Sequence, residues 1–253
     1  MTDTDFAIEV HGLSRRFADF IAIKDVTLKV RRGHIHALIG PNGAGKTTFF
    51  NLLTKTLDPS AGTILYKGRN ITRMAPAQVA QMGMVRSFQI SAIFSTLTVL
   101  DNVRVALQRA HGTSFHFWRS VKELDSLNER ANALLQDVGL ADKADVTAGD
   151  LSYGRKRALE IATTLALDPE LLLLDEPTSG MGLEDVAHAA ALIRRVARTR
   201  TVLMVEHNLG VVADLADRIT VLASGTVLTE GTYAEVASDP RVQAAYIGRE
   251  VKA

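Results

Sequence analysis

The sequence feature that most constrains this chain is the glycine-rich stretch G-P-N-G-A-G-K-T at residues 40–47. It matches the pattern G-x-x-x-x-G-K-[ST], in which the backbone N–H groups of a loop converge on phosphate groups. The apolar run Ile35–Ile39 precedes it and predicts a strand, and a helical pattern follows from Lys46 to about Lys55. A helix that begins at such a loop adds partial positive charge for an anion. The stretch therefore predicts nucleotide binding, with a chance glycine-rich turn as the alternative.

Two side chains of this stretch carry chemistry of their own. The Lys46 ammonium supplies a point charge for the β- and γ-phosphates, and the Thr47 hydroxyl is a candidate ligand for Mg²⁺. The candidate nucleotide-binding residues of the stretch and of the next position are Gly40, Pro41, Asn42, Gly43, Ala44, Gly45, Lys46, Thr47 and Thr48.

A second motif, L-L-L-L-D-E-P at residues 171–177, combines a fully apolar run with two carboxylates. Such a run predicts a strand buried on both faces, and ligands collect at the carboxyl ends of strands in open α/β sheets. Neighbouring side chains point to opposite sides of a strand, so Asp175 and Glu176 should have different roles. Asp175 suits coordination of Mg²⁺, and Glu176 suits orienting or deprotonating an attacking water. A strand that simply ends in solvated acids is the alternative interpretation.

A third motif, L-S-Y-G-R at residues 151–155, precedes a helical pattern. Ser152 is a favourable N-cap residue, and that role alone explains its position. The same geometry offers an anion-binding surface, because a helix N-terminus with a hydroxyl and a glycine presents hydrogen-bond donors. Both interpretations stand at the level of the sequence.

Composition excludes several other kinds of protein. The 253 residues include 29 Lys or Arg and 28 Asp or Glu, which give a formal net charge of +1. This balance argues against a dedicated nucleic-acid binder, whose affinity comes from excess positive charge. No cysteine is present, so disulfides, thiolate metal sites and cysteine nucleophiles are excluded. The polar, acidic N-terminus predicts no secretory signal, and no window has the run of about 18 apolar residues that predicts a membrane-spanning helix.

The order of predicted elements indicates an α/β fold with a mostly parallel sheet. Strand patterns lie at residues 7–10, 26–30, 35–39, 63–66, 85–89, 171–174, 201–205, 219–222 and 226–229, and further helical patterns at 155–167 and 183–198. The region from residue 99 to about 138 differs, because it has helical spacing and no strong strand pattern. We expect one domain over residues 1–253. Its α/β core and β part comprise residues 1–89 and 156–253, and a helical subdomain covers about 90–155.

In this order and separation, the three motifs resemble those of the ATP-binding subunits of ABC transporters, and the resemblance spans nearly the whole chain. It implies a P-loop NTPase core with an N-terminal antiparallel β part, and ATP and Mg²⁺ as cofactors. It also implies that residues 40–47 are the Walker A loop and 171–176 the Walker B strand. Residues 151–155 correspond to the signature motif, in which Ser152 and Gly154 contact the γ-phosphate.

The resemblance assigns roles to three further residues. Gln89 matches the glutamine that senses Mg²⁺ and contacts the membrane partner, and His207 matches the switch histidine that contacts the γ-phosphate. Phe17 matches the aromatic residue that stacks on adenine. The implied catalytic residues are Glu176, His207, Gln89 and Lys46, and the implied metal ligands are Thr47, Gln89 and Asp175.

Two motifs depart from the family pattern. Tyr153 and Arg155 replace a glycine and a glutamine of the commonest signature motif. Gly182 replaces the aspartate that usually ends the loop after the Walker B strand. Arg155 adds positive charge beside a bound phosphate, which is compatible with binding. The change at Gly182 affects the expected communication across a dimer more than it affects hydrolysis.

The signature tyrosine, the stretch V-R-S-F-Q at residues 85–89 and the ending Y-I-G at 246–248 are similar to ATPases of branched-chain amino-acid importers. Gly180 followed by Met181 is also found in ATPases of urea and short-amide importers. A soluble ABC ATPase without a membrane partner and a small-molecule kinase are alternatives from other classes.

An importer implies integral-membrane permease subunits, a second ATPase chain (identical or related) and, indirectly, a periplasmic or extracellular solute-binding protein. It implies no nucleic acid, and it places the chain at the cytoplasmic face of the inner membrane as a peripheral protein. Phe94, Phe115, Phe117 and Trp118 form a local excess in a chain with 6% aromatic residues. Aromatic residues are frequent anchors of interfaces, so we expect the region of about 90–120 to dock the permease. Packing inside the helical subdomain is the alternative.

Overall fold

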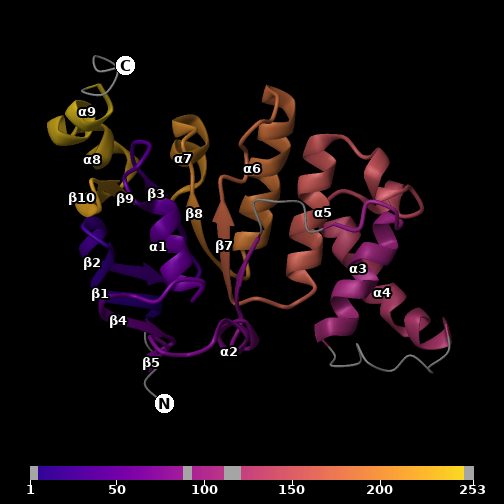
Figure 1. Cartoon of the computed structure of the whole chain (residues 1–253). Helices are drawn as coiled ribbons and strands as arrows, with labels where there is room; N and C mark the ends of the chain where they lie inside the picture. Colours follow the sequence, from indigo (N-terminus) through magenta and orange to yellow (C-terminus); the bar gives the residue numbers. More distant parts are fainter. Residues whose placement is uncertain (1–4, 88–92, 111–120, 248–253) are drawn as a thin grey trace.

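The computed structural model describes residues 5–87, 93–110 and 121–247, and its centre is a six-stranded sheet (Figure 1). The strand order is β10-β9-β3-β8-β7-β6, and neighbouring strands are parallel except β9 and β10. The strands are β3 (Ile35–Ile39), β6 (Met84–Arg86), β7 (Leu171–Asp175), β8 (Thr201–Val205), β9 (Arg218–Ala223) and β10 (Thr226–Gly231). The prediction of an α/β fold with a mostly parallel sheet is confirmed.

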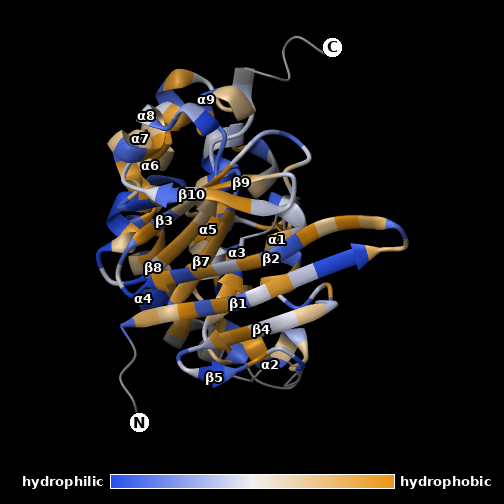
Figure 2. Ribbon diagram, turned by 90° about the vertical axis from the view of Figure 1, so that its left-hand side faces the viewer, coloured by the Kyte–Doolittle hydropathy of each residue, from blue (hydrophilic) through white to orange (hydrophobic). Residues whose placement is uncertain are grey.

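The central strands are buried on both faces. Along β7, Leu172 and Leu174 belong to one hydrophobic cluster and Leu171 and Leu173 to the other, as alternating side chains require. Figure 2 shows the apolar character of β7 and β8. The helices are α1 (Lys46–Leu53), α2 (Pro76–Gln81), α3 (Val99–Ala110), α4 (Val121–Asp137), α5 (Tyr153–Leu165), α6 (Leu183–Ala197), α7 (Leu209–Leu215), α8 (Tyr233–Ser238) and α9 (Pro240–Ile247). Side chains of α3 to α7 contribute to the first cluster, and those of α1 contribute to the second.

The N-terminal strands form a second, antiparallel sheet with the order β2-β1-β4-β5. These strands are β1 (Phe6–Phe17), β2 (Phe20–Arg31), β4 (Ala61–Tyr66) and β5 (Arg69–Asn70). The hairpin of β1 and β2 reaches beyond the rest of the molecule in Figure 2. The implied antiparallel β part is therefore confirmed.

This hairpin is longer than the sequence pattern indicates, since the pattern marks only residues 7–10 and 26–30. The pairing of β1 with β2 shifts register between Val10 and Leu13 and again between Leu13 and Arg15. Each bulge interrupts the alternation of apolar and polar residues, so the distal half of the hairpin has no clear strand signal. The strand expected at 85–89 is β6, which ends at Arg86.

Between β6 and α5, the described residues form α3, α4 and two 3₁₀ turns, Ala141–Lys143 and Ala148–Asp150. The buried side chain of Asn102 in α3 ties this part together. Its Nδ2 donates to Phe94 O at 3.1 Å and to Thr98 O at 2.8 Å, and its Oδ1 accepts from Phe94 N at 2.7 Å. Among the helices that the structure describes, none is long and apolar enough to cross a bilayer.

Hydrogen bonds link polar side chains of three neighbouring strands, from β3 through β9 to β10. His36 is 1% exposed, and its Nε2 lies 2.8 Å from Thr220 Oγ1 of β9. The Thr220 hydroxyl donates to Glu230 Oε2 at 3.0 Å, so the imidazole donates to the hydroxyl. Burial lowers the pKa of His36 to about 4; the Glu230 carboxylate opposes this shift and the Arg218 guanidinium adds to it.

Stability should therefore fall as the pH drops from about 6.5 to about 4, because the unfolded imidazole binds a proton in this window and the folded one does not. The part due to His36 should approach about 3 kcal/mol of unfolding free energy. Urea unfolding of wild type and His36→Gln at both pH values measures it, and the difference between the two pH values should be smaller in the variant. His188→Gln changes an exposed histidine of α6 and should keep the wild-type pH dependence. Equal pH dependence of His36→Gln and wild type would contradict this account.

Candidate functional site

Three neighbouring strands end at the same level and deliver the candidate residues to one edge of the sheet. Val205 of β8 pairs with Leu38 of β3 on one side and with Asp175 of β7 on the other. The glycine-rich loop follows β3, and Glu176 and Glu206 follow β7 and β8 directly. The edge therefore brings together the glycine-rich loop and the carboxylates of the second motif.

The glycine-rich loop packs closely against the backbone of two other segments. A Cβ atom at Gly40 would lie 2.0 Å from the Leu222 carbonyl oxygen of β9, and one at Gly45 would lie 2.7 Å from Ala22 O of β2. Ala44 O accepts a hydrogen bond from Gly225 N at 3.0 Å. Only glycine fits at positions 40 and 45, because the nearest atom at each position is a backbone carbonyl oxygen.

The Lys46 side chain lies within this loop and is 8% exposed. Its Nζ donates to Gly40 O at 2.7 Å and to Pro41 O at 3.2 Å. The ammonium is therefore held inside the loop by two of the loop's own carbonyl oxygens. Thr47 is exposed and Thr48 half-buried in the first turn of α1.

Asp175 is a buried carboxylate with a cationic partner. It is 1% exposed, and its Oδ2 accepts a hydrogen bond from Arg86 Nη2 of β6. Arg86 Nη1 also donates to Asn51 Oδ1 of α1 at 2.6 Å, and Arg157 Nη2 of α5 donates to the Asp175 carbonyl at 2.9 Å. Since removing one partner of a buried ion pair is costly, Arg86 makes the burial of this carboxylate possible.

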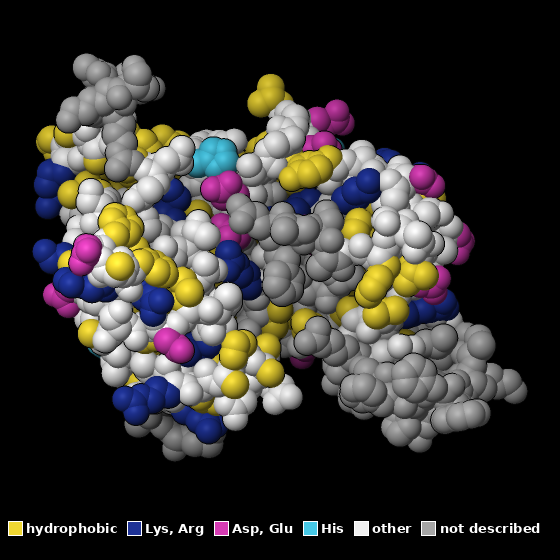
Figure 3. All heavy atoms as spheres, viewed as in Figure 1, with side chains coloured by type: hydrophobic (Ala, Val, Ile, Leu, Met, Phe, Trp, Pro, Cys, Tyr) yellow, Lys and Arg dark blue, Asp and Glu magenta, His cyan; other side chains and the backbone are white. Residues whose placement is uncertain are grey.

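Glu176 and His207 lie next to each other, on two different strand ends. His207 Nδ1 is 3.9 Å from Glu176 Oε2, and the two side chains are 57% and 32% exposed. Figure 3 shows a histidine with acidic side chains beside it on this face. Glu176 has a φ of +46°, a left-handed conformation that is strained for a residue with a side chain. Strain of this kind persists where the surroundings fix the backbone, and it is common at functional sites.

The signature motif lies at the start of α5, away from the glycine-rich loop. Figure 1 shows α1 and α5 on opposite sides of β7. Ser152 is the N-cap residue of α5, as its residue type predicts, and Ser152 O accepts from Lys156 N at 2.9 Å, but its exposed hydroxyl makes no capping bond. A Cβ atom at Gly154 would lie 2.6 Å from the Asp185 carboxylate of α6, so glycine lets these two helix ends approach.

The remaining candidates lie away from this edge or outside the described residues. Phe17, at the tip of the β1–β2 hairpin, is 39% exposed, and the Arg15 guanidinium lies 4.6 Å from its ring centroid. Phe94 is 54% exposed. The positions outside the described residues are Gln89, Phe115, Phe117 and Trp118.

Sequence reasoning missed Arg86, Arg157 and Glu206. Glu206 is fully buried and accepts hydrogen bonds from backbone N–H groups of the segment after β7 and of the segment after β8. It directly follows the apolar strand β8, which is the same signal that identified Asp175 and Glu176. Arg86 and Arg157 gave no such signal, because their partners are distant in the sequence.

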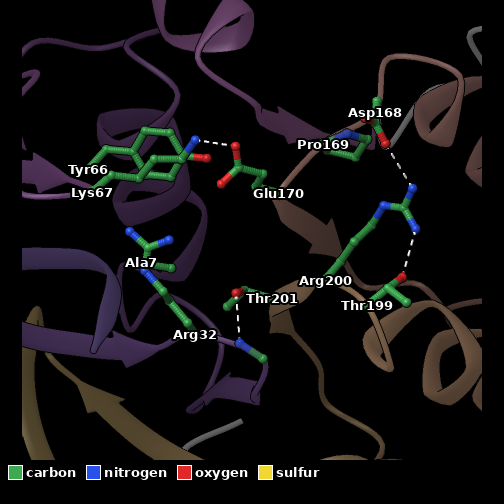
Figure 4. A pocket seen from close by; sticks show the side chains of 11 residues that line it. Ala7, Arg32, Tyr66, Lys67, Asp168, Pro169, Glu170, Thr199, Arg200 and Thr201 are labelled. Atoms are coloured by element: carbon green, nitrogen blue, oxygen red, sulfur yellow. Dashed lines mark hydrogen bonds and ion pairs between the residues drawn. The ribbon is translucent and has the colours of Figure 1, made fainter. Parts of the chain in front are cut away.

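A separate hollow of about 410 Å³ lies at the other end of β7 and β8 (Figure 4). It is lined by Lys67, which pairs with Glu170, and by Arg200, whose Nη2 lies 3.1 Å from Asp168 Oδ1. Glu170 and Arg200 precede these strands, whereas the motif residues follow them. The hollow is therefore distinct from the glycine-rich edge, and these acidic and basic side chains neutralise one another.

Comparison with known families agrees with this geometry. Residues 23–179 match the ABC transporter family, and residues 226–252 match the branched-chain amino acid ATP-binding cassette transporter family. The chain is 37% identical to the high-affinity branched-chain amino acid transport ATP-binding protein LivG of Salmonella typhimurium. The identity to the corresponding protein BraF of Pseudomonas aeruginosa is also 37%. Each comparison covers 95% of this chain and 97% of the relative.

Solved structures show the same relationship. The ADP conformation of MJ1267, an ATP-binding cassette of an ABC transporter, has a TM-score of 0.86 at 27% identity. The comparison covers 97% of this chain and 100% of that chain. A nucleotide-free ATP-binding cassette from an ABC transporter has a TM-score of 0.84 at 26% identity, with 96% of this chain and 100% of that chain covered. Fold and site thus define a nucleotide-binding ATPase with a P-loop. More narrowly, the chain belongs to the ABC transporter family, in which it is an ATP-binding subunit that hydrolyses ATP.

The close packing at Gly40 generates a direct test with a matched control at the other end of β3. Gly40→Ala should lower the unfolding free energy by about 3 kcal/mol or more, because a Cβ 2.0 Å from a carbonyl oxygen forces the backbone to shift. Gly33 has a φ of +69°, but a Cβ atom there would meet nothing within 4 Å, so Gly33→Ala should cost about 1 kcal/mol. Denaturant unfolding of both variants measures the difference. Equal losses of unfolding free energy in the two variants would show that the close contact between position 40 and Leu222 O does not restrict the residue at position 40.

Proposed function

We propose that this chain is the ATP-hydrolysing subunit of an ABC importer for branched-chain or other hydrophobic amino acids. One observation carries the chemical part: Glu176 and His207 lie 3.9 Å apart at the edge where the loop holding Lys46 leaves the sheet. Glu176 orients or deprotonates the water that attacks the γ-phosphorus. His207 and Lys46 contact the γ-phosphate, and the bond from phosphorus to the leaving β-phosphate oxygen breaks.

The residues at this edge fit Mg²⁺ as a second cofactor. The ion prefers oxygen ligands and keeps several waters, and the edge offers the Thr47 hydroxyl and the Asp175 carboxylate. Asp175 is held in place by Arg86 through Oδ2, which leaves Oδ1 as the oxygen for the metal or its water. We assign Gln89 as a further ligand. When bound, Mg²⁺ neutralises charge on the β- and γ-phosphates.

The family matches support the proposed solute. LivG and BraF are described as high-affinity branched-chain amino acid transport proteins, and residues 226–252 match a family of the same description. An importer of urea or short amides is the second candidate, favoured by Gly180-Met181. Neighbouring genes separate the alternatives. Two permeases, a second ATPase and a solute-binding protein beside this gene would support import, and their absence would favour a soluble ABC ATPase.

In this proposal the chain works at the cytoplasmic face of the inner membrane, bound to permease subunits, and a periplasmic or extracellular solute-binding protein delivers the solute. Residues 1–253 act as one ATPase domain, and its helical subdomain, about 90–155, docks the permease. Exposure of Phe94 supports this surface, because aromatic side chains are frequent interface anchors. Phe17, at the hairpin tip, stacks on the adenine.

A second ATPase chain, identical or related, completes the site. Figure 1 shows α1, which follows the loop with Lys46, and α5, which follows Ser152, on opposite sides of β7. This placement and the exposure of Ser152 support a site in which one bound ATP is shared between two chains. Ser152 and Gly154 of one chain therefore contact the γ-phosphate held by the glycine-rich loop of the other.

Glu176→Gln should bind ATP with near-wild-type affinity and lower kcat at least about 100-fold, because it keeps the shape of the side chain but removes the base. Lys46→Ala should also lose ATP binding. Phosphate release and binding of a fluorescent ATP analogue measure the two properties. Glu170→Gln is the matched control, since it changes a carboxylate at the opposite end of β7, and it should keep kcat. Wild-type hydrolysis by Glu176→Gln would overturn the assignment.

Mixing two inactive variants should restore ATPase activity if the site is shared. Lys46→Ala disables the loop and Ser152→Arg disables the signature motif, so a mixed dimer keeps one intact site and one doubly defective site. About a quarter of the wild-type rate is expected, because random pairing makes half of the dimers mixed and each has half the sites. Absence of recovery in a sample shown to contain mixed dimers would reject sharing of the site.

A further inference from the structure

One buried carboxylate joins the two chain segments that carry Glu176 and His207. Glu206, directly after β8, is 0% exposed. Its Oε1 accepts from Thr178 N at 3.0 Å and from the Thr178 hydroxyl. Its Oε2 accepts from His207 N at 2.8 Å and from Asn208 N at 3.0 Å. Four donors from two segments therefore converge on a single side chain.

The chemistry of this arrangement requires a carboxylate. Among the described residues, no Lys or Arg nitrogen lies within ion-pair distance of Glu206, and His207 Nδ1 lies 3.9 Å from Oε2. Both oxygens face donors, so the charge is held by N–H and hydroxyl groups, as in other buried anions. A glutamine would keep one acceptor but turn its amide hydrogens toward one pair of these donors. The site is thus specific for an ionised side chain, although burial of a charge is unfavourable in itself.

On one side, Glu206 fixes the strained turn at Glu176. The N–H of Glu176 donates to Val205 O at 2.9 Å, and Thr178, two residues further on, donates to Glu206. Residues 205 and 206 therefore hold the chain before and after the left-handed conformation of Glu176, whose φ is +46°. A strained φ persists when its surroundings over-determine it.

On the other side, Glu206 fixes the start of the segment that carries His207. Its Oε2 bonds the N–H groups of His207 and Asn208. The Asn208 side chain in turn caps α7, because its Oδ1 accepts from Gly210 N at 3.1 Å and from Val211 N at 3.3 Å. The backbone that carries the imidazole is thus fixed relative to both the sheet and α7.

We propose that Glu206 is a positioning residue for ATP hydrolysis, which sets the separation of Glu176 and His207 by holding both backbone segments on one carboxylate. This inference rests on the roles proposed above for those two residues. Because Glu206 is fully buried, this role requires no contact of Glu206 with the nucleotide or with the attacking water. Its removal should change the alignment of Glu176, the proposed base, with His207, the proposed γ-phosphate contact. A misplacement of about 1 Å at such a site can lower the rate about 100-fold.

The test compares Glu206→Gln with Thr201→Val, a matched control that removes a buried hydrogen-bond acceptor at the other end of β8. The Thr201 hydroxyl accepts from Gly33 N at 3.0 Å. Glu206→Gln should lower kcat by about 10- to 100-fold per folded molecule and change the affinity for a fluorescent ATP analogue less than about threefold. Thr201→Val should lower the melting temperature but keep kcat. If both variants lose melting temperature and keep kcat, Glu206 is only structural and the proposal is wrong.

Thr178→Val provides a milder variant that serves if Glu206→Gln does not fold. Valine is close in shape to threonine but lacks the hydroxyl, so the variant removes one of the four donors to Glu206 and keeps the backbone donor Thr178 N. It should lower kcat about 3- to 10-fold without loss of ATP binding, since the segment after Glu176 is held by fewer bonds. Unchanged kcat in Thr178→Val, with Glu206→Gln either unfolded or fully active, would overturn the proposal.

Glu176→Gln, measured in parallel, separates this inference from the function on which it rests. If Glu176→Gln hydrolyses ATP at the wild-type rate, the proposed roles at the edge are wrong. If Glu176→Gln is slow and the Glu206 and Thr178 variants have the kcat of wild type, only the positioning role is wrong. A slow rate in all three with retained binding of the ATP analogue supports both.

Discussion

The structure depends on one constraint in the central sheet: the neighbouring strands β3, β8 and β7 end at the same level. Because Val205 is paired with Leu38 on one side and with Asp175 on the other, the three strands stop in one line. The loop after β3 then faces the carboxylates after β7 and β8. A change of register by one residue would turn Asp175 to the opposite face and separate it from Arg86.

Two buried carboxylates at this edge are stabilised in different ways. Asp175 has a guanidinium partner, which also bonds to Asn51 and thus joins β6, β7 and α1. Glu206 relies on backbone N–H groups and a hydroxyl. A flexible cationic side chain can follow a carboxylate that exchanges ligands, whereas backbone donors hold a carboxylate still. The difference suits a metal-binding role for Asp175 and a fixed role for Glu206.

The sequence predicts the parts of this site that depend on local patterns. Apolar runs and glycine spacing locate β3, β7, β8 and the loop at Gly40 correctly, because each pattern is contained within a few residues. Arg86 and Asp175 are 89 residues apart, and Thr178 and Glu206 are 28 apart, so their pairing arises only from the order of strands in the sheet. Ser152 is the N-cap residue of α5, as predicted, but its hydroxyl makes no capping bond. Its residue type favours a cap, but the orientation of the hydroxyl depends on surroundings that the local sequence does not specify.

The central position of β3 in the sheet has a consequence for folding during synthesis on the ribosome. This strand is made early, yet its two neighbours are β8 and β9, and His36 pairs with Leu203 and Arg218. At synthesis rates of about 5–20 residues per second, the nascent strand waits roughly 10 to 40 s for them. During that interval β3, in which every residue except His36 is apolar, and the glycine-rich loop after it lack their neighbours in the central sheet. The glycine-rich loop is therefore synthesised long before the strands that flank β3 in the finished sheet.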